Sequence, residues 1–150
     1  MKIFVASIYH PDDIKEIGEF NETLSSLMNL IPKNIEFIGG HDVTKNLGVR
    51  KQMYKKVIGI YELEKPNMKG RNLFGVLRAN NLRVINSFKK KRIYTTYISK
   101  FKAKSPHMLD VITCSTSFFK CISDCGVITK GVWSDHSAVI MVFLNRSIKF

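Results

Sequence analysis

The segment IFVASIYHPDDIKEIGEFNETLSSLMNLIPKNIEFIGGHD, residues 3–42, carries the clearest fold signal in this chain. Residues 3–9 are mostly apolar and rich in β-formers, which predicts a buried strand. Over residues 14–30 the apolar positions recur at three- and four-residue spacing, which predicts an amphipathic helix. Residues 35–38 predict a second strand. A strand, a helix and a second, parallel strand form a βαβ unit, so we expect an α/β fold.

Two polar side chains fall where the strands of this unit end. Tyr9 closes the first strand, and Asp42 follows the second after Gly39 and Gly40. We expect the two glycines to turn the backbone tightly and bring Asp42 to the sheet edge, where ligands of such sheets bind. A carboxylate placed there can meet a metal-bound water or a phosphate. The alternative interpretation is an ordinary Gly-Asp turn.

The rest of the chain continues the alternation of strands and helices within one domain, residues 1–150. We expect a basic loop, a helix and five further strands, over residues 49–69, 71–80, 82–86, 94–99, 108–114, 121–127 and 138–144. A chain of 150 residues with 45% hydrophobic content can bury a sizeable core. Its cysteines, Cys114, Cys121 and Cys125, lack C-x-x-C spacing, which predicts buried free thiols.

The apolar runs are all too short for a membrane helix, which needs about 18 residues. The first eight residues turn polar too quickly for a signal peptide. We therefore expect an intracellular protein, in the nucleus or the cytoplasm, without a membrane partner.

An acid and a histidine lie next to each other just before the last predicted strand. Asp135 and His136 precede the apolar run 138–144. Asp110 stands within another apolar strand, where an isolated carboxylate is costly to bury without a partner. We expect His136 to be that partner. The alternative is that Asp110 faces solvent and that the Asp135-His136 pair is an ordinary surface feature.

The charge of the chain is concentrated in its second part. Residues 1–64 hold 8 Lys and Arg against 9 Asp and Glu, whereas residues 65–150 hold 16 against 3. Such a one-sided positive field suits a polyanion. The run Lys89, Lys90, Lys91 and Arg92, followed by Tyr97, combines phosphate-binding charges with an aromatic stacking face. The alternative is a solvated lysine-rich loop.

Several of these pieces together resemble one family. They are, in chain order, Tyr9 at a strand end, Gly40 to Thr44, Asn86-Ser87-Phe88, Thr96-Tyr97, Leu109-Asp110-Val111 and Ser134-Asp135-His136. In this order and rough spacing they resemble the endonuclease/exonuclease/phosphatase superfamily, which includes abasic-site endonucleases and the endonuclease domains of LINE-type retrotransposons. The match spans nearly the whole chain.

The resemblance implies a role for each matching residue. Asp135 would help to hold Mg²⁺ or Mn²⁺, and His136 would hydrogen-bond the scissile phosphate. Asp110 would fix the tautomer of His136, Asp42 would orient or deprotonate the attacking water, and Tyr9 would approach the phosphate from the side. The implied reaction is metal-dependent, in-line hydrolysis of a nucleic-acid phosphodiester, with DNA as the first candidate.

The chain also departs from the family pattern. Thr44 stands where the family has an Asn, and the family's complete domain is nearly twice as long, with a metal-binding Glu in its first half. The resemblance therefore implies a partial four-layer α/β sandwich that lacks the N-terminal half. We expect a mixed sheet with helices on one face and an uncovered apolar face that invites a missing N-terminal segment or self-association.

Two functions of different class follow from the sequence. One is a divalent-metal-dependent endonuclease, or a retroelement-derived piece of one with reduced or no activity alone. The alternative is a catalytically silent, basic fragment that binds nucleic acid or a partner. Salt-sensitive binding without cleavage would select the second.

Overall fold

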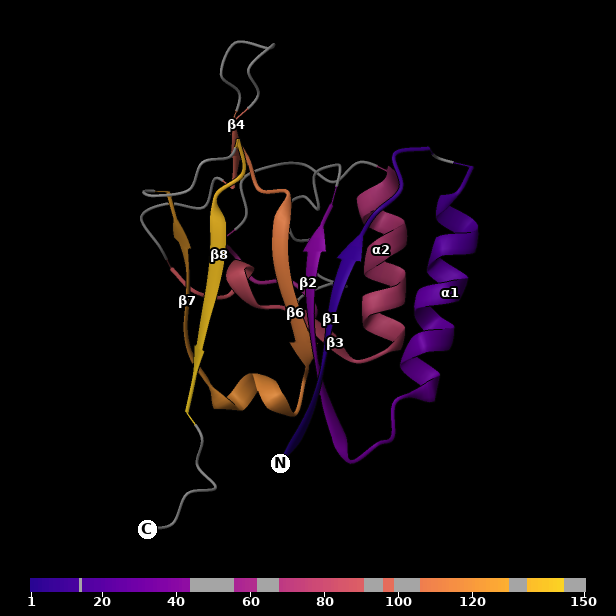
Figure 1. Cartoon of the computed structure of the whole chain (residues 1–150), viewed down its shortest axis with the longest axis horizontal. Coiled ribbons are helices and arrows are strands. Elements are labelled where there is room, and N and C mark those ends of the chain that lie inside the picture. The colour runs from indigo at the N-terminus through magenta and orange to yellow at the C-terminus, as the bar shows by residue number, and fades with distance from the viewer. Residues whose placement is uncertain are drawn as a thin grey trace.

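The structure of the chain is a computed structural model. The structure describes residues 1–13, 15–43, 56–61, 68–90, 96–98, 106–129 and 135–144. Figure 1 shows a layered α/β arrangement in which two helices lie side by side next to a sheet.

The main sheet is mixed and has four strands in the order β1-β2-β6-β3. These are β1 (Lys2–Tyr9), β2 (Ile35–Asp42), β6 (Asp110–Ser115) and β3 (Leu82–Val84). β1 and β2 are parallel and are joined through the helix α1 (Ile17–Leu30), so the predicted βαβ unit is confirmed. β6 is antiparallel to both β2 and β3.

The helices α1 and α2 (Met68–Ala79) cover one face of this sheet (Figure 1). A core of apolar side chains from both helices and the sheet joins the two layers, with Leu24, Phe37, Leu73, Phe74, Leu77 and Val111 among its members. The apolar stripes predicted for the two helices therefore meet the sheet, and the expectation of helices on one face is confirmed.

A smaller layer lies on the opposite face. It contains the antiparallel pair β7 (Ile122–Ile128) and β8 (Ala138–Phe143), with the 3-10 helices η2 (Ile85–Ser87) and η3 (Phe118–Cys121) beside it. A second core joins this layer to the sheet, with Ile38, Ile85, Cys114, Phe118, Ile122 and Cys125 as its buried members. A short ribbon of β4 (Tyr97–Ile98) and β5 (Pro106–His107) completes the described elements.

The structure corrects three details of the sequence analysis. Gly39 and Gly40 do not form a turn, because β2 continues through both of them to Asp42. The predicted strand 82–86 ends at Val84, and η2 takes its place. Part of the predicted loop 49–69 belongs to the core, since Val57 and Ile58 are buried and Ile58 forms a parallel bridge with Val84.

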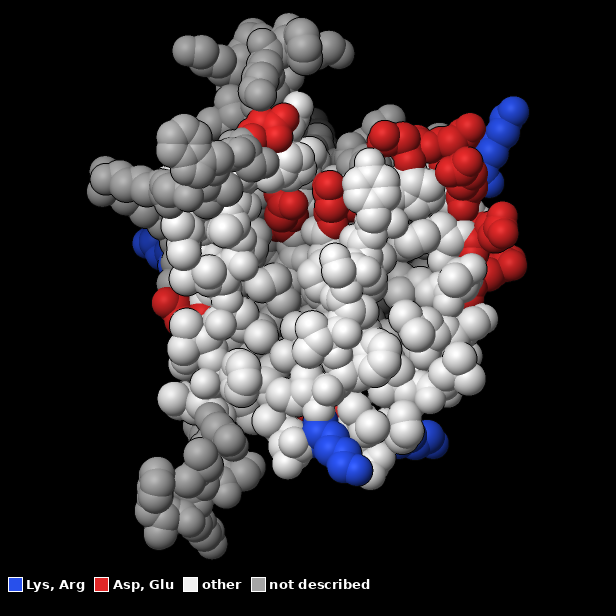
Figure 2. All heavy atoms as spheres, in the orientation of Figure 1, with Lys and Arg blue, Asp and Glu red and all other residues white. Residues whose placement is uncertain are grey.

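The described elements leave part of the second face uncovered, as the sequence analysis expected. The β7–β8 pair packs over the β6 side of the sheet, whereas Val5 on β1 remains 70% exposed. On β8 the outward residues Ile140 and Val142 are also exposed. In the described part of the chain, β1 and β8 each pair with a strand on one side only. Figure 2 shows a broad surface that is mostly uncharged, with acidic side chains gathered at its upper end and basic side chains at its lower end.

Two further observations bear on the sequence analysis. Among the helices that the structure describes, none is both long enough and apolar enough to cross a lipid bilayer. All three cysteines are free thiols, as expected, although only Cys114 and Cys125 are fully buried.

Candidate active site at the strand ends

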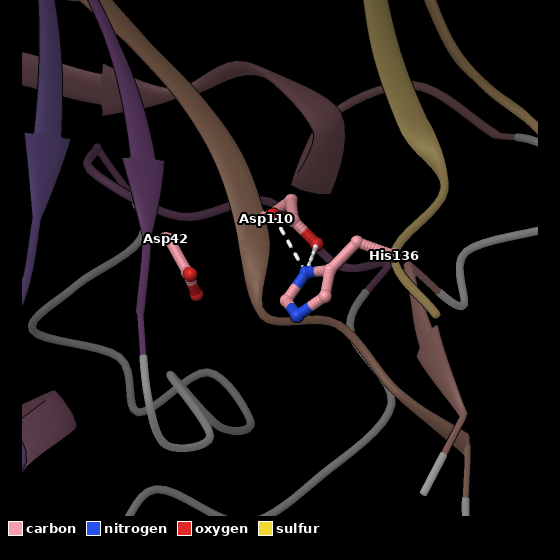
Figure 3. A group of neighbouring side chains, drawn as sticks. All are labelled: Asp42, Asp110 and His136. Carbon is pink, nitrogen blue, oxygen red and sulfur yellow. Dashed lines mark hydrogen bonds and ion pairs between the residues drawn. The ribbon is translucent and has the colours of Figure 1, made fainter. Parts of the chain in front are cut away.

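β1 and β2 end, and the antiparallel β6 begins, at the same end of the sheet, which brings the predicted polar residues together. Tyr9 is the register partner of Asp42 across β1 and β2, and Asp42 is the partner of Asp110 across β2 and β6. His136 stands just before β8 and forms an isolated bridge with Tyr97. Figure 3 shows Asp42, Asp110 and His136 converging on one space from three separate segments.

Asp110 and His136 form a close pair. The Nδ1 atom of His136 lies 2.9 Å from one carboxylate oxygen of Asp110 and 3.1 Å from the other (Figure 3). The predicted partnership of these residues is therefore confirmed. Because a carboxylate can only accept, Nδ1–H of His136 must be the donor.

The charges in this group act on one another. Burial lowers the pKa of His136, but the hydrogen bond and charge of Asp110, together with the charges of Asp42 and Asp135, raise the pKa above its ordinary value. Burial and the Asp110 charge raise the pKa of Asp42, and the charge of His136 offsets only part of that rise. The site thus favours a protonated imidazole beside a carboxylate of increased proton affinity.

Thr96 holds two parts of the site in place. Its Oγ1 accepts the backbone N–H groups of Leu109 and Asp110, each at 2.9 Å, and its carbonyl accepts the N–H of Ser137 at 2.6 Å. The side chain is completely buried. The sequence analysis placed Thr96 only as part of a motif, because nothing in its β-rich surroundings indicates which backbone groups it meets.

Tyr97 forms an aromatic wall against the histidine. Its ring centroid lies 4.9 Å from that of His136 and 6.3 Å from that of His107. The ring is half-buried. It therefore limits the orientations open to His136, and its contact with nucleic acid remains a prediction.

A cleft of about 400 Å³ opens above the strand ends. Asp42 and Asp110 line it, with Gly40 and Ser137 close by and Tyr9 at its side. The ring of Tyr9 is exposed, so it is available to a bound molecule. A second cleft, lined by Asp12, Glu16 and Glu19, adjoins Tyr9 on the α1 side.

The donor set fits a divalent cation. One ligand atom each from Asp42, Asp110 and His136 lie within 4.8 Å of one another. Two carboxylates suit a hard cation such as Mg²⁺ or Mn²⁺, which would also relieve the repulsion between Asp42 and Asp110. Asp135 is exposed and lies outside this group of three, so its role as a metal ligand remains a prediction.

The predicted basic contacts are placed only in part. Lys89 donates through Nζ to the carbonyls of Ile122 and Ser123, each at 3.3 Å, which ties it to β7. Lys90 is exposed. The other predicted residues, Lys91, Arg92 and Thr44, lie outside the described residues. The nucleic-acid contacts of the basic run therefore remain predictions.

No family model matches the sequence, and no curated protein matches it significantly. Solved structures do match. The endonuclease domain of TRAS1, a telomere-specific non-LTR retrotransposon, matches with a TM-score of 0.62 and 19% identity over 91% of this chain and 54% of that one. A 3'-5' exonuclease from Neisseria meningitidis has a TM-score of 0.56 and 14% identity over 86% of this chain and 52% of its own.

An AP endonuclease from Archaeoglobus fulgidus has a TM-score of 0.57 and 16% identity, and covers 90% of this chain and 57% of its own. The chain thus spans about half the length of the structures it matches. At identities this low, the matches show a similar backbone arrangement and nothing more. That arrangement agrees with the resemblance in sequence. Over about half of their length, the chain shares the fold of these nuclease structures, as the resemblance to the endonuclease/exonuclease/phosphatase superfamily implies.

Proposed function

We propose that this chain carries the acid–base part of a divalent-metal-dependent phosphodiesterase site that cleaves nucleic acid, with DNA as its substrate. The Asp110–His136 pair facing Asp42 across the cleft is the observation that carries the proposal. Structures of similar fold include an endonuclease, an exonuclease and AP endonucleases, which supports a reaction at a phosphodiester.

The chain's own residues would act on opposite sides of the phosphorus. Asp42, with its raised pKa, would orient a water molecule and accept its proton as the water oxygen attacks in line. The bond from phosphorus to the leaving oxygen would break as the bond to the water oxygen forms, and the leaving alkoxide would take a proton from solvent water. His136, held protonated by Asp110, would donate from Nε2 to a phosphate oxygen as negative charge builds there.

A divalent cation would be held near the carboxylates of Asp42 and Asp110, with Asp135 as a candidate ligand. When bound, it would supply charge neutralisation at the phosphate. The acidic character of the site makes this contribution necessary, because Asp42 and Asp110 would otherwise repel a phosphodiester.

Electrostatics also favour one approach for the polymer. The cleft on the α1 side of Tyr9 is lined by Asp12, Glu16 and Glu19, which repel phosphates. The basic part of the chain, residues 65–150, supplies the opposite sign. We infer that the nucleic acid crosses the site on the side of Tyr97, away from α1.

We further propose that residues 1–150 act as one half of the fold and that the open face of β1 and β8 is covered in the active protein. The neighbours' chains are about twice as long, and strands added at the edge of β8 would extend over Val5. In the absence of such a segment, the open apolar face of β1 and β8 predicts that the chain associates with itself.

The test is a nicking assay on supercoiled plasmid and on an abasic-site duplex, with Mg²⁺, Mn²⁺ or EDTA. We expect metal-dependent nicking that falls by at least about a hundredfold in His136→Ala and Asp42→Asn. Glu22→Gln, an exposed substitution on α1 away from both clefts, serves as the control and should retain the activity. Nicking that is unchanged in both site variants would refute the assignment.

A second function, binding without cleavage, is favoured by one observation. Residues 65–150 hold 16 Lys and Arg against 3 Asp and Glu, and such a positive charge binds a polyanion whether or not a phosphodiester is cleaved. Retention of DNA that weakens steeply with salt, without nicking under any metal condition, would select this silent binding fragment.

A further inference from the structure

The outer edge of β6 changes partner beside the catalytic pair. β3 pairs with β6 through Leu82, Arg83 and Val84, which face Ser115, Cys114 and Thr113. After Val84 the chain turns into η2 and leaves the sheet. The stretch of β6 next to Asp110 therefore has no neighbouring strand from β3, and its backbone polar groups need other partners.

The side chain of Asn86 takes the place of that strand. Its Nδ2 donates to the carbonyl of Asp110 at 3.1 Å, and its Oδ1 accepts the N–H of Ile112 at 3.2 Å. Asn86 is only 5% exposed. A single amide thus satisfies two groups on β6, as a paired strand would, with one donor and one acceptor.

These contacts complete the enclosure of Asp110. Its N–H donates to Oγ1 of Thr96, and its carbonyl accepts from Asn86. Across the sheet it faces Asp42. Asp110 is the first residue of β6, where a strand frays most readily, yet both its backbone polar groups are held by buried side chains.

We propose that Asn86 is a positioning residue for the Asp110–His136 pair. By fixing the backbone at Asp110, it sets the direction of the carboxylate and so keeps the proton of His136 on Nδ1. Its catalytic meaning rests on the proposed function, but its structural effect does not. Asn86 itself touches no reacting atom.

The position of the proton on the His136 ring can be measured, and a loss of overall stability alone would not change it. At an alkaline pH where the ring is neutral, the ¹⁵N shifts of His136 report which nitrogen carries the proton. We expect the unaltered protein to hold the proton on Nδ1. In Asn86→Leu, which removes both hydrogen bonds, we expect a mixture of the two tautomers.

Two further variants make the test specific. Asn86→Asp keeps the oxygen that accepts from Ile112 but, when ionised, repels the carbonyl of Asp110, so it should also mix the tautomers. Ser87→Ala is the matched control, because Ser87 is buried in the same 3-10 helix and bonds Gly59 and Val84, not β6. It should lower the stability and leave the tautomer of His136 unchanged.

Each outcome decides the proposal. Mixed tautomers in both Asn86 variants, with an unaltered ratio in Ser87→Ala, support it. An unaltered ratio in the folded Asn86 variants, or an equal change in Ser87→Ala, overturns it. Where nicking is measurable, the Asn86 variants should lose roughly 10- to 100-fold in kcat with little change in KM. If the protein does not nick DNA at all, the proposed function fails while the tautomer measurement still tests Asn86.

Discussion

Acidification should destabilise this protein through two histidines buried behind the strand ends. The Nε2 atom of His10 lies 3.0 Å from Nδ1 of His41, and Nε2 of His41 lies 2.7 Å from Oγ1 of Thr113. The Thr113 hydroxyl donates to the carbonyl of Gly39. The protons therefore run in one direction, from His10 to His41 to Thr113. Because Nδ1 of His41 must accept, His41 has to be neutral, and burial disfavours the charged form of His10.

The size of the effect follows from the pKa values. Burial lowers the pKa of His10 from 6.5 to about 4. Burial and the charge of His10 lower the pKa of His41 from 6.5 to about 3. Because the unfolded chain takes up protons below pH 6.5 and the folded chain does not, stability is lost as the pH falls from there toward about 4 and 3. Between about pH 7.5 and about pH 5, each histidine accounts for about 2 kcal/mol and the two for about 4 kcal/mol.

Urea unfolding at a series of pH values measures this loss, and His41→Gln isolates it. The glutamine keeps a donor and an acceptor but does not titrate, so the decrease from about pH 7.5 to about pH 5 should shrink by about half. Asp42 and His136 have raised pKa values and act in the opposite direction, but they do so in both proteins and cancel in the comparison. The same pH dependence in His41→Gln would refute the reasoning, as would a stability that does not fall over this range.

Three further outcomes are expected. In Gly39→Ala a methyl group would lie 2.8 Å from the His41 ring, so urea unfolding should show a loss of about 1–3 kcal/mol, whereas Gly75→Ala, on a helix with open space around it, should gain about 0.5–1 kcal/mol. Thr96→Val should lower the free energy of unfolding by about 1–3 kcal/mol for each of the two N–H groups left without an acceptor. Thr96→Ser keeps the hydroxyl and should retain most of the stability. Equal losses in the two variants would contradict the hydrogen bonding. Ile140→Lys should reduce self-association in sedimentation velocity, because a charge on the exposed edge of β8 opposes strand pairing, and an unaltered sedimentation profile would exclude that edge as the contact.

The sequence predicts the strands and helices well where a pattern is regular. The βαβ unit follows from a β-rich run, an amphipathic stretch and a second run, and the partnership of Asp110 with His136 follows from the cost of burying an isolated carboxylate. The role of Gly39 and Gly40 is not predictable in this way. A Gly-Gly pair is typical of a turn, yet here β2 stays extended and Gly39 provides space for the ring of His41.

Contacts that depend on the exact residue at which a strand or helix ends also cannot be predicted from the sequence. Whether the chain after Val84 continues as a strand or turns away decides whether Asn86 pairs along β6 through its backbone or its side chain. The His10–His41 chain depends in the same way on the register of β1 against β2. Residue patterns indicate which face is buried, but they do not fix such registers to a single residue.

The described chain holds part of the proposed site by itself, and a segment that covers the open face would add the rest. Asp42, Asp110 and His136 are held by contacts made within the described chain, so the group of three is formed before anything covers β1 and β8. Covering strands would lie over Val5 and reach the same cleft, where they would exclude water and could add ligands to the cation. The specific activity should therefore reveal the occupant. If it is independent of protein concentration, one chain suffices, whereas a rise with concentration that is lost in Ile140→Lys would mean that a second copy covers the cleft.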